Sequence, residues 1–191
     1  MNTTTTQRLQ PDLVVLTQAA PVPGRGFLPI ASYLLLGKQP VLVDTGAARH
    51  RAGFVEALES VLDPKDLAWI VVSHADEDHT GALELLLDRA PKARIAMNWL
   101  STGKLSAHFD PPMPRVTWVN PGEALVAGDR VLHALRPPMY DCPSTTTFFD
   151  SKSRALFTSD AFGAFVPAMA ETFADVDEKA VLEGMSVFCR A

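Results

Sequence analysis

The stretch HADEDHTG, from His74 to Gly81, holds two histidines and three acidic residues directly after an apolar run. That run, from Leu67 to Val72, has the β-branched, aromatic and uninterrupted apolar character of a strand buried on both faces. Alternate side chains of a tight loop at the end of such a strand can converge on two adjacent metal ions. The potential ligands are His74, Asp76, Asp78 and His79. A solvated acidic turn is the alternative, but it would explain neither the histidines nor the buried strand before them.

Composition restricts the class of protein. With 191 residues, 47% of them apolar, the chain is long enough for one domain, which we expect over residues 1–191. A net charge of -5 without a run of Lys or Arg argues against a nucleic-acid partner. The two cysteines, Cys142 and Cys189, form no disulfide framework, so a reducing, cytoplasmic location is expected. Residues 1–10 have neither a signal peptide nor a membrane anchor and predict a flexible tail, and no apolar run approaches the roughly 20 residues that cross a bilayer.

The pattern along the chain is one of short strands with helices interleaved. Strands are expected at 13–16, 32–36, 40–43, 67–72, 94–97, 116–119, 124–126, 130–135, 146–149 and 155–158. Helices are expected from His50 to Pro64, from an N-cap at Thr80 to Pro91, and from Phe173 to Cys189. This order predicts an α/β fold in which sheets pack face to face with helices outside.

Three segments resemble a known family. HADEDHTGAL after WIVVSH, preceded by PVLVDTG, resembles the metallo-β-lactamase fold family, whose loop reads His-x-His-x-Asp-His. Asp76 stands at the second histidine of that loop, and a carboxylate there resembles the flavodiiron proteins and the related stand-alone oxygen-binding diiron proteins, which have Glu. LFTSDAFGAF, from Leu156 to Phe165, is similar to the segment in which those proteins place the aspartate that bridges two irons, here Asp160. The resemblance implies an αβ/βα sandwich of two packed mixed β-sheets with outer helices.

The chain departs from the family pattern at two places. Counting back from Asp160 without a gap, the third histidine ligand of the family aligns with Asp141, which could be a ligand or a turn-forming aspartate. In the family, the last histidine ligand lies well downstream of the bridging aspartate. This sequence ends at Ala191, before that position is reached. The C-terminal part of the fold is therefore expected to be incomplete. Asp44, in LVDTG, either orients a ligand histidine from the second coordination shell or caps its own turn.

The expected metal ligands are His74, Asp76, Asp78, His79, Asp141 and Asp160. Two neutral imidazoles and four carboxylates balance the charge of two divalent ions, and oxygen-rich ligation favours iron, with manganese or zinc possible.

The resemblance implies a binuclear, non-haem diiron metalloprotein of the flavodiiron type, which binds or reduces a small diatomic such as oxygen or nitric oxide. Its electrons would come from a separate donor protein, and a flavin would come only from a partner or from the interface of a homo-oligomer. The alternative enzyme is a metal-dependent hydrolase of an ester, thioester or lactam, against which Asp76 and Asp141 argue. A metal-depleted binding or sensing module is the third hypothesis.

Overall fold

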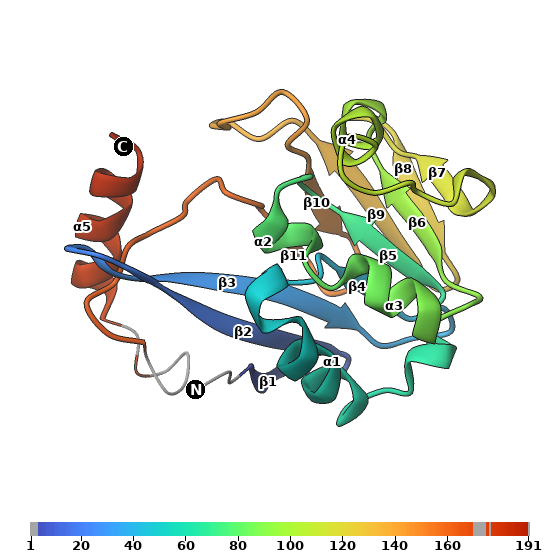
Figure 1. The fold of residues 1–191 in the computed structure, drawn as a ribbon, viewed down its shortest axis with the longest axis horizontal. Coiled ribbons are helices and arrows are strands. Elements are labelled where there is room, and N and C mark those ends of the chain that lie inside the picture. The colour runs from blue at the N-terminus through green and yellow to red at the C-terminus, as the bar shows by residue number, and fades with distance from the viewer. Residues whose placement is uncertain (1–3, 170–174, 176, 191) are drawn as a thin grey trace.

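The computed structural model describes residues 4–169, 175 and 177–190, and the chain forms a layered α/β structure (Figure 1). The larger sheet has its seven strands in sequence order. They are β1 (Thr5–Gln10), β2 (Leu13–Val22), β3 (Gly26–Leu35), β4 (Val41–Val43), β5 (Trp69–Val72), β6 (Arg94–Met97) and β7 (Val116–Trp118). Strands β1 to β4 pair antiparallel and β4 to β7 pair parallel, so the sheet is mixed.

The smaller sheet has four antiparallel strands in the order β11-β10-β9-β8. They are β8 (Ala124–Ala127), β9 (Arg130–Leu135), β10 (Thr147–Asp150) and β11 (Ala155–Phe157). The α-helices are α1 (Arg51–Glu59), α2 (Glu77–Thr80), α3 (Leu83–Arg89), α4 (Trp99–Leu105) and α5 (Glu178–Phe188). Short 3-10 helices lie at Ala48–His50, Pro64–Asp66 and Met113–Arg115.

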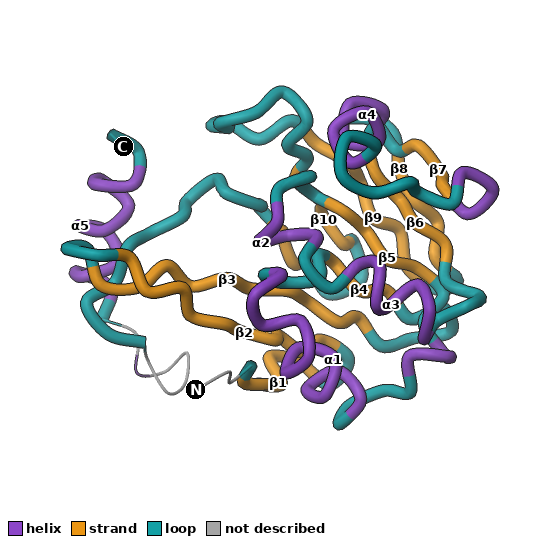
Figure 2. Tube along the Cα trace, in the orientation of Figure 1, coloured by secondary structure: helices purple, strands orange, loops and turns teal. Residues whose placement is uncertain are grey.

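Strand β5 shows how one apolar run serves two cores. Ile70 and Val72 belong to the core beneath α1 and α3, whereas Trp69 and Val71 belong to the core between the two sheets. All four residues of β5 are buried, because successive side chains of a strand point to opposite faces. The expected sandwich is therefore confirmed, and helices α1 and α3 cover one face of the larger sheet (Figure 2). The expectation that both sheets are mixed is wrong for the smaller one, because the hairpin-like connections of its described strands pair them antiparallel.

Several boundaries differ from the expectations. The flexible tail expected over residues 1–10 is wrong for Thr5–Gln10, which pairs antiparallel with β2, while residues 1–3 lie outside the described part of the chain. Strands β2 and β3 are ten residues each and form a long hairpin rather than two short segments. Thr80 does not cap a long helix: it ends α2, and its hydroxyl donates to the Asp76 carbonyl.

Helix α5 forms within the expected 173–189 segment, of which residues 173, 174 and 176 lie outside the description. It packs against the segment before it and near the tip of the β2–β3 hairpin, away from the sandwich (Figure 1). Gly184 is the contact point, since a Cβ there would lie 1.8 Å from the Phe165 carbonyl oxygen. Among the described residues, no helix has both the length and the apolar composition needed to cross a bilayer.

Candidate metal centre

The centre lies where the parallel strands β4 and β5 end. Val43 pairs with Val71, so the residues that follow these strands are neighbours. The Asp44 backbone N–H donates to the Val71 carbonyl at 2.8 Å, and the Asp44 carboxylate accepts from the Ser73 N–H at 2.8 Å and from the Ser73 hydroxyl at 2.5 Å. Asp44 adopts a φ of 60°, which a residue with a side chain rarely takes without support from its surroundings. The end of β5 and the start of the polar loop are thereby fastened to β4.

The short helix α2 is docked on the segment that follows Asp44. The His79 carbonyl accepts from the Thr45 N–H at 2.7 Å and from the Thr45 hydroxyl at 3.1 Å. The Gly81 N–H donates to the Gly46 carbonyl at 2.8 Å. A Cβ on Gly81 would lie 1.9 Å from the Ala48 backbone nitrogen, so only glycine permits this close approach. The segment from Thr45 to Ala48 consequently fixes the position of the His79 backbone.

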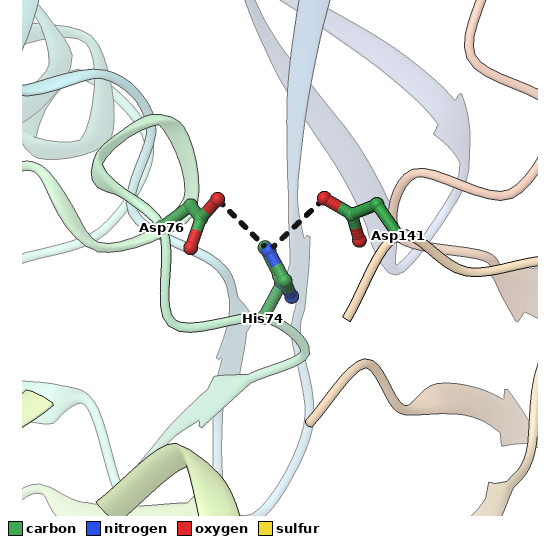
Figure 3. Close-up of side chains that lie close together, drawn as sticks. All are labelled: His74, Asp76 and Asp141. Atoms are coloured by element: carbon green, nitrogen blue, oxygen red, sulfur yellow. Dashed lines mark ion pairs between the residues drawn. The ribbon is translucent and has the colours of Figure 1, made fainter. Parts of the chain in front are cut away.

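The first set of ligand atoms, the His74 group, consists of His74, Asp76 and Asp141, and its three potential donor atoms lie within 4.8 Å of one another (Figure 3). His74 Nε2 is 3.2 Å from Asp76 Oδ2 and 3.8 Å from Asp141 Oδ2. The two carboxylates approach the imidazole from opposite sides in the close-up. Asp141 comes from the loop between β9 and β10, far from the others in sequence, and the fold brings it beside His74.

The second set, the His79 group, consists of Asp78, His79 and Asp160, again with donor atoms within 4.8 Å of one another. His79 Nε2 is 2.9 Å from Asp160 Oδ1 and 3.8 Å from Asp78 Oδ2. His79 Nδ1 lies 3.0 Å from Asp44 Oδ2. Because an ionised carboxylate only accepts hydrogen bonds, Nδ1 donates to Asp44, and Nε2 is the nitrogen directed at Asp160. Asp44 thus contacts His79, the histidine that it would orient in its expected role in the second coordination shell.

Asp160 faces both histidines. Its Oδ1 is 2.9 Å from His79 Nε2, and its Oδ2 is 3.8 Å from His74 Nε2. The turn after β11 that carries Asp160 has two further residues in the left-handed region, Ser159 with φ 54° and Phe162 with φ 71°. Such conformations persist where the surrounding structure enforces them and are frequent at functional sites. One carboxylate is thus presented to two groups at once.

The His74 ring is buried, and within the described structure its Nε2 has no partner in hydrogen-bond geometry, although the carboxylate oxygen Oδ2 of Asp76 lies 3.2 Å away. Its other nitrogen, Nδ1, lies 3.0 Å from the Thr145 hydroxyl. Leaving a buried polar atom without a partner costs about 1–3 kcal/mol. A cation between Nε2 and the facing carboxylates would remove that cost, so the donor set and its orphaned nitrogen fit a metal ion.

The charges of the centre are coupled. Burial opposes protonation of His79, but Asp44 and Asp160 outweigh it and raise the pKa of His79 well above its ordinary value. Burial raises the pKa of Asp78, and the negative charge of Asp160 adds to that rise. Burial also acts to raise the pKa of Asp160, but the hydrogen bond and charge of His79 outweigh it, so the Asp160 pKa is lowered. Without a metal, the cluster therefore depends on a proton at His79 to offset its carboxylates.

Two residues of the centre were absent from the sequence prediction. Thr145 contacts His74 and also donates to Asp141 Oδ1 at 3.4 Å. Lys104 donates from Nζ to Asp76 Oδ1 at 2.9 Å and to the thiol of Cys142 at 3.2 Å. Neither has a spacing signal, because each reaches the site from another part of the chain. The polar run around Thr145, PSTTT, is the one local hint, since it precedes a buried strand near Asp141.

Comparison with known proteins places these observations in a family context. Residues 28–191 match the family model described as ODP family beta lactamase. An uncharacterised protein of Methanocaldococcus jannaschii is 32% identical over 142 residues, which are 74% of this chain and 36% of that protein. The anaerobic nitric oxide reductase flavorubredoxin of Salmonella typhi is 32% identical over 133 residues, 69% of this chain and 28% of that protein. The chain thus spans well under half the length of these relatives.

Solved structures share the fold. Rubredoxin oxygen:oxidoreductase from Desulfovibrio gigas superposes with a TM-score of 0.86 at 20% identity, covering 96% of this chain and 48% of that one. The flavodiiron protein from Giardia intestinalis superposes with a TM-score of 0.84 at 16% identity, covering 96% of this chain and 47% of that one. At these identities the likeness concerns the fold, and it covers about half of each longer chain.

Proposed function

The chain belongs to the ODP beta-lactamase family, and from that membership and the paired ligand groups we propose that it is a binuclear, non-haem diiron protein of the flavodiiron type. The observation that carries the proposal is Asp160, whose two carboxylate oxygens face one histidine each. His74, Asp76 and Asp141 would hold one ion, Asp78 and His79 would hold the other, and Asp160 would bridge them. Four carboxylates among six ligands favour iron over zinc, with manganese as a further possibility.

The protein side chains have defined tasks in this proposal. Asp44 accepts a hydrogen bond from the Nδ1–H of His79 and so directs Nε2 at the site, and the Thr145 hydroxyl orients His74. When bound, a pair of iron ions supplies redox chemistry for a small diatomic such as oxygen or nitric oxide. The substrate follows by analogy with the relatives, whose names include nitric oxide reductase and rubredoxin oxygen:oxidoreductase.

Electrons would have to come from a donor protein, with any flavin supplied by a partner or at the interface of a homo-oligomer. We further propose that residues 1–191 act as one domain, since the apolar core between the two sheets joins them. The described cysteines Cys142 and Cys189 are free thiols, which supports a reducing compartment such as the cytoplasm.

Metal content tests the proposal. We expect elemental analysis of the anaerobically purified chain to give about two irons per chain, as a two-metal site requires, with an absorption spectrum that changes on exposure to oxygen. Two zincs would instead support a hydrolase, to be followed by assays on esters and thioesters. Substoichiometric metal would support the metal-depleted module.

Asp160→Ala is the decisive variant. Because Asp160 faces both groups, we expect the variant to lose both metals while keeping its far-ultraviolet circular dichroism. Asp110→Ala changes an exposed aspartate outside the centre and should retain both ions. Retention of two metals per chain by Asp160→Ala would contradict the bridging role.

A further inference from the structure

The two ligand groups differ in how firmly the protein holds their carboxylates. In the His74 group the side chains of Asp76 and Asp141 are 49% and 59% exposed. In the His79 group the side chain of Asp78 is 36% exposed, and that of the shared Asp160 is 24% exposed. Binding a metal to an exposed side chain requires that side chain to lose more rotamer freedom. The His79 group is therefore the better preorganised of the two.

Support from neighbouring residues also differs between the two groups, although each histidine has a partner, Thr145 for His74 and Asp44 for His79. His79 contacts the buried carboxylate of Asp44, which is itself held by two hydrogen bonds from Ser73. Asp76, in contrast, receives its side-chain hydrogen bond from a lysine on the surface, Lys104. Lys104 Nζ contacts Asp76 Oδ1, while Asp76 Oδ2 faces His74 Nε2 at 3.2 Å. One carboxylate oxygen is thus held from outside, and the other is left directed at the histidine.

Helix α4, which carries Lys104, is tied to the rest of the centre. The Asn98 side chain caps the helix by accepting from the Ser101 N–H at 2.7 Å. The same side chain donates to the Thr146 hydroxyl at 2.8 Å, and the Thr146 N–H donates to the Ser73 carbonyl at 2.8 Å. These hydrogen bonds fix the backbone of Lys104 relative to the loop that carries the ligands. An incidental ion pair on the surface would have no such support.

We propose that Lys104 is a positioning residue for Asp76, and that the two groups take up metal in order, the His79 group first and the His74 group second. This inference rests on the proposed binuclear function. Hydrogen-bond partners of ligating carboxylates restrict their orientation and thereby raise metal affinity. The charge of Lys104 repels a nearby cation, but Nζ contacts the oxygen turned away from His74, and its side chain is 41% exposed, so that solvent screens the repulsion.

Titration of the metal-free chain with Co²⁺, followed by its visible absorption and by competition with a chelator, tests both parts. We expect two binding steps in the wild type. Lys104→Met should weaken the second step about ten- to hundredfold and change the first by less than about twofold. Lys104→Arg should restore most of the loss, because a guanidinium also donates to a carboxylate. Lys92→Met, on an exposed turn between α3 and β6, is the matched control and should change neither step.

The order of filling is assigned with Asp76→Asn, which should remove the second step and leave the first. The inference is overturned by two equal affinities in the wild type, by loss of the first step in Asp76→Asn, or by an unchanged or tighter second step in Lys104→Met. Binding of fewer than two Co²⁺ ions to the wild-type chain would overturn the binuclear function along with it, so the two failures are distinguishable.

Discussion

Two clusters of charged residues lie at opposite ends of the sandwich, and they are built differently. At the end of β10 away from the metal centre, the buried Arg130 guanidinium contacts Asp150 at 2.5 Å, the Leu36 carbonyl at 2.9 Å and the Asp12 carboxylate. Lys152 adds a second cation to this Arg130 cluster, so positive and negative groups are nearly balanced.

The metal centre has no such balance. Five carboxylates surround its two histidines, those of Asp44, Asp76, Asp78, Asp141 and Asp160, and Lys104 is the one lysine or arginine with a described contact to them. Folding alone does not require such an excess of negative charge, because desolvating unpaired charges is costly. The Arg130 cluster therefore carries its own counter-charges, whereas the excess carboxylates of the candidate metal centre are what the proposed cations would neutralise.

The largest effect on the free energy of unfolding is expected at the Arg130 cluster. Arg130→Met would leave the fully buried Asp150 without its cation, and breaking a buried ion pair in this way costs about 3–5 kcal/mol. We expect urea unfolding of the metal-free protein to show this loss. The double variant Arg130→Met/Asp150→Leu should recover most of it, since apolar replacement of a whole buried pair is often neutral. A loss below about 1 kcal/mol in the single variant would show that the cluster is no more than a surface ion pair.

A change of opposite sign is expected at the metal centre. Burial raises the pKa of Asp78 and the neighbouring Asp160 raises it further, so the ionised carboxylate is unfavourable in the metal-free fold. Asp78→Asn should therefore stabilise the metal-free protein slightly, since solvent screens the charge of a side chain that is 36% exposed, while weakening metal binding at the His79 group. Thermal unfolding with and without Co²⁺ measures both. If the variant were instead less stable without metal, Asp78 would stabilise the fold. The two clusters would then not differ in the effect of their charges on stability.

Elements with a local signal were predicted well from the sequence. The strand expected at 94–97 is β6, and β5 occupies the last four residues of the expected 67–72 run, because each is an apolar segment bounded by turn-forming residues. Strand β1 was missed because TTQRLQ is polar and its six residues are mostly exposed. It is a strand because β2 provides backbone partners, and such tertiary pairing leaves little trace in the side-chain pattern.

The residues of the candidate site also divide into those with a local sequence signal and those that tertiary contacts bring to the site. The four potential ligands of the HADEDHTG loop are close in sequence, so their spacing was informative. Asp160 was identified through the resemblance of its segment, and Asp141 through counting back from it. Thr145 and Lys104 were missed because their roles exist only after the β9–β10 loop and α4 have packed beside the metal loop. Second-layer contacts of this kind depend on tertiary geometry, which the order of residues does not display.

The smallest effect is expected for Asp129, an exposed residue at the edge of the Arg130 cluster. Its pH dependence tests whether a charge stabilises the fold in this cluster and destabilises it at the candidate metal centre. Lys152 donates to Asp129 at 2.8 Å and the Lys38 N–H donates at 3.0 Å, and these bonds hold the pKa of Asp129 well below its ordinary value.

A depressed carboxyl pKa contributes stability that is present above the ordinary value of about 3.9 and is lost as pH falls below it toward the folded-state pKa. Asp129→Asn should therefore lower stability slightly at neutral pH, with the difference from wild type shrinking as pH falls below about 4 and in high salt. Urea midpoints across that range measure it. The raised pKa of Asp78 has the opposite sign, because protonation there relieves an unfavourable charge in the fold. If Asp129→Asn and Asp78→Asn shifted stability in the same direction at neutral pH, charge balance would not be what distinguishes the two clusters.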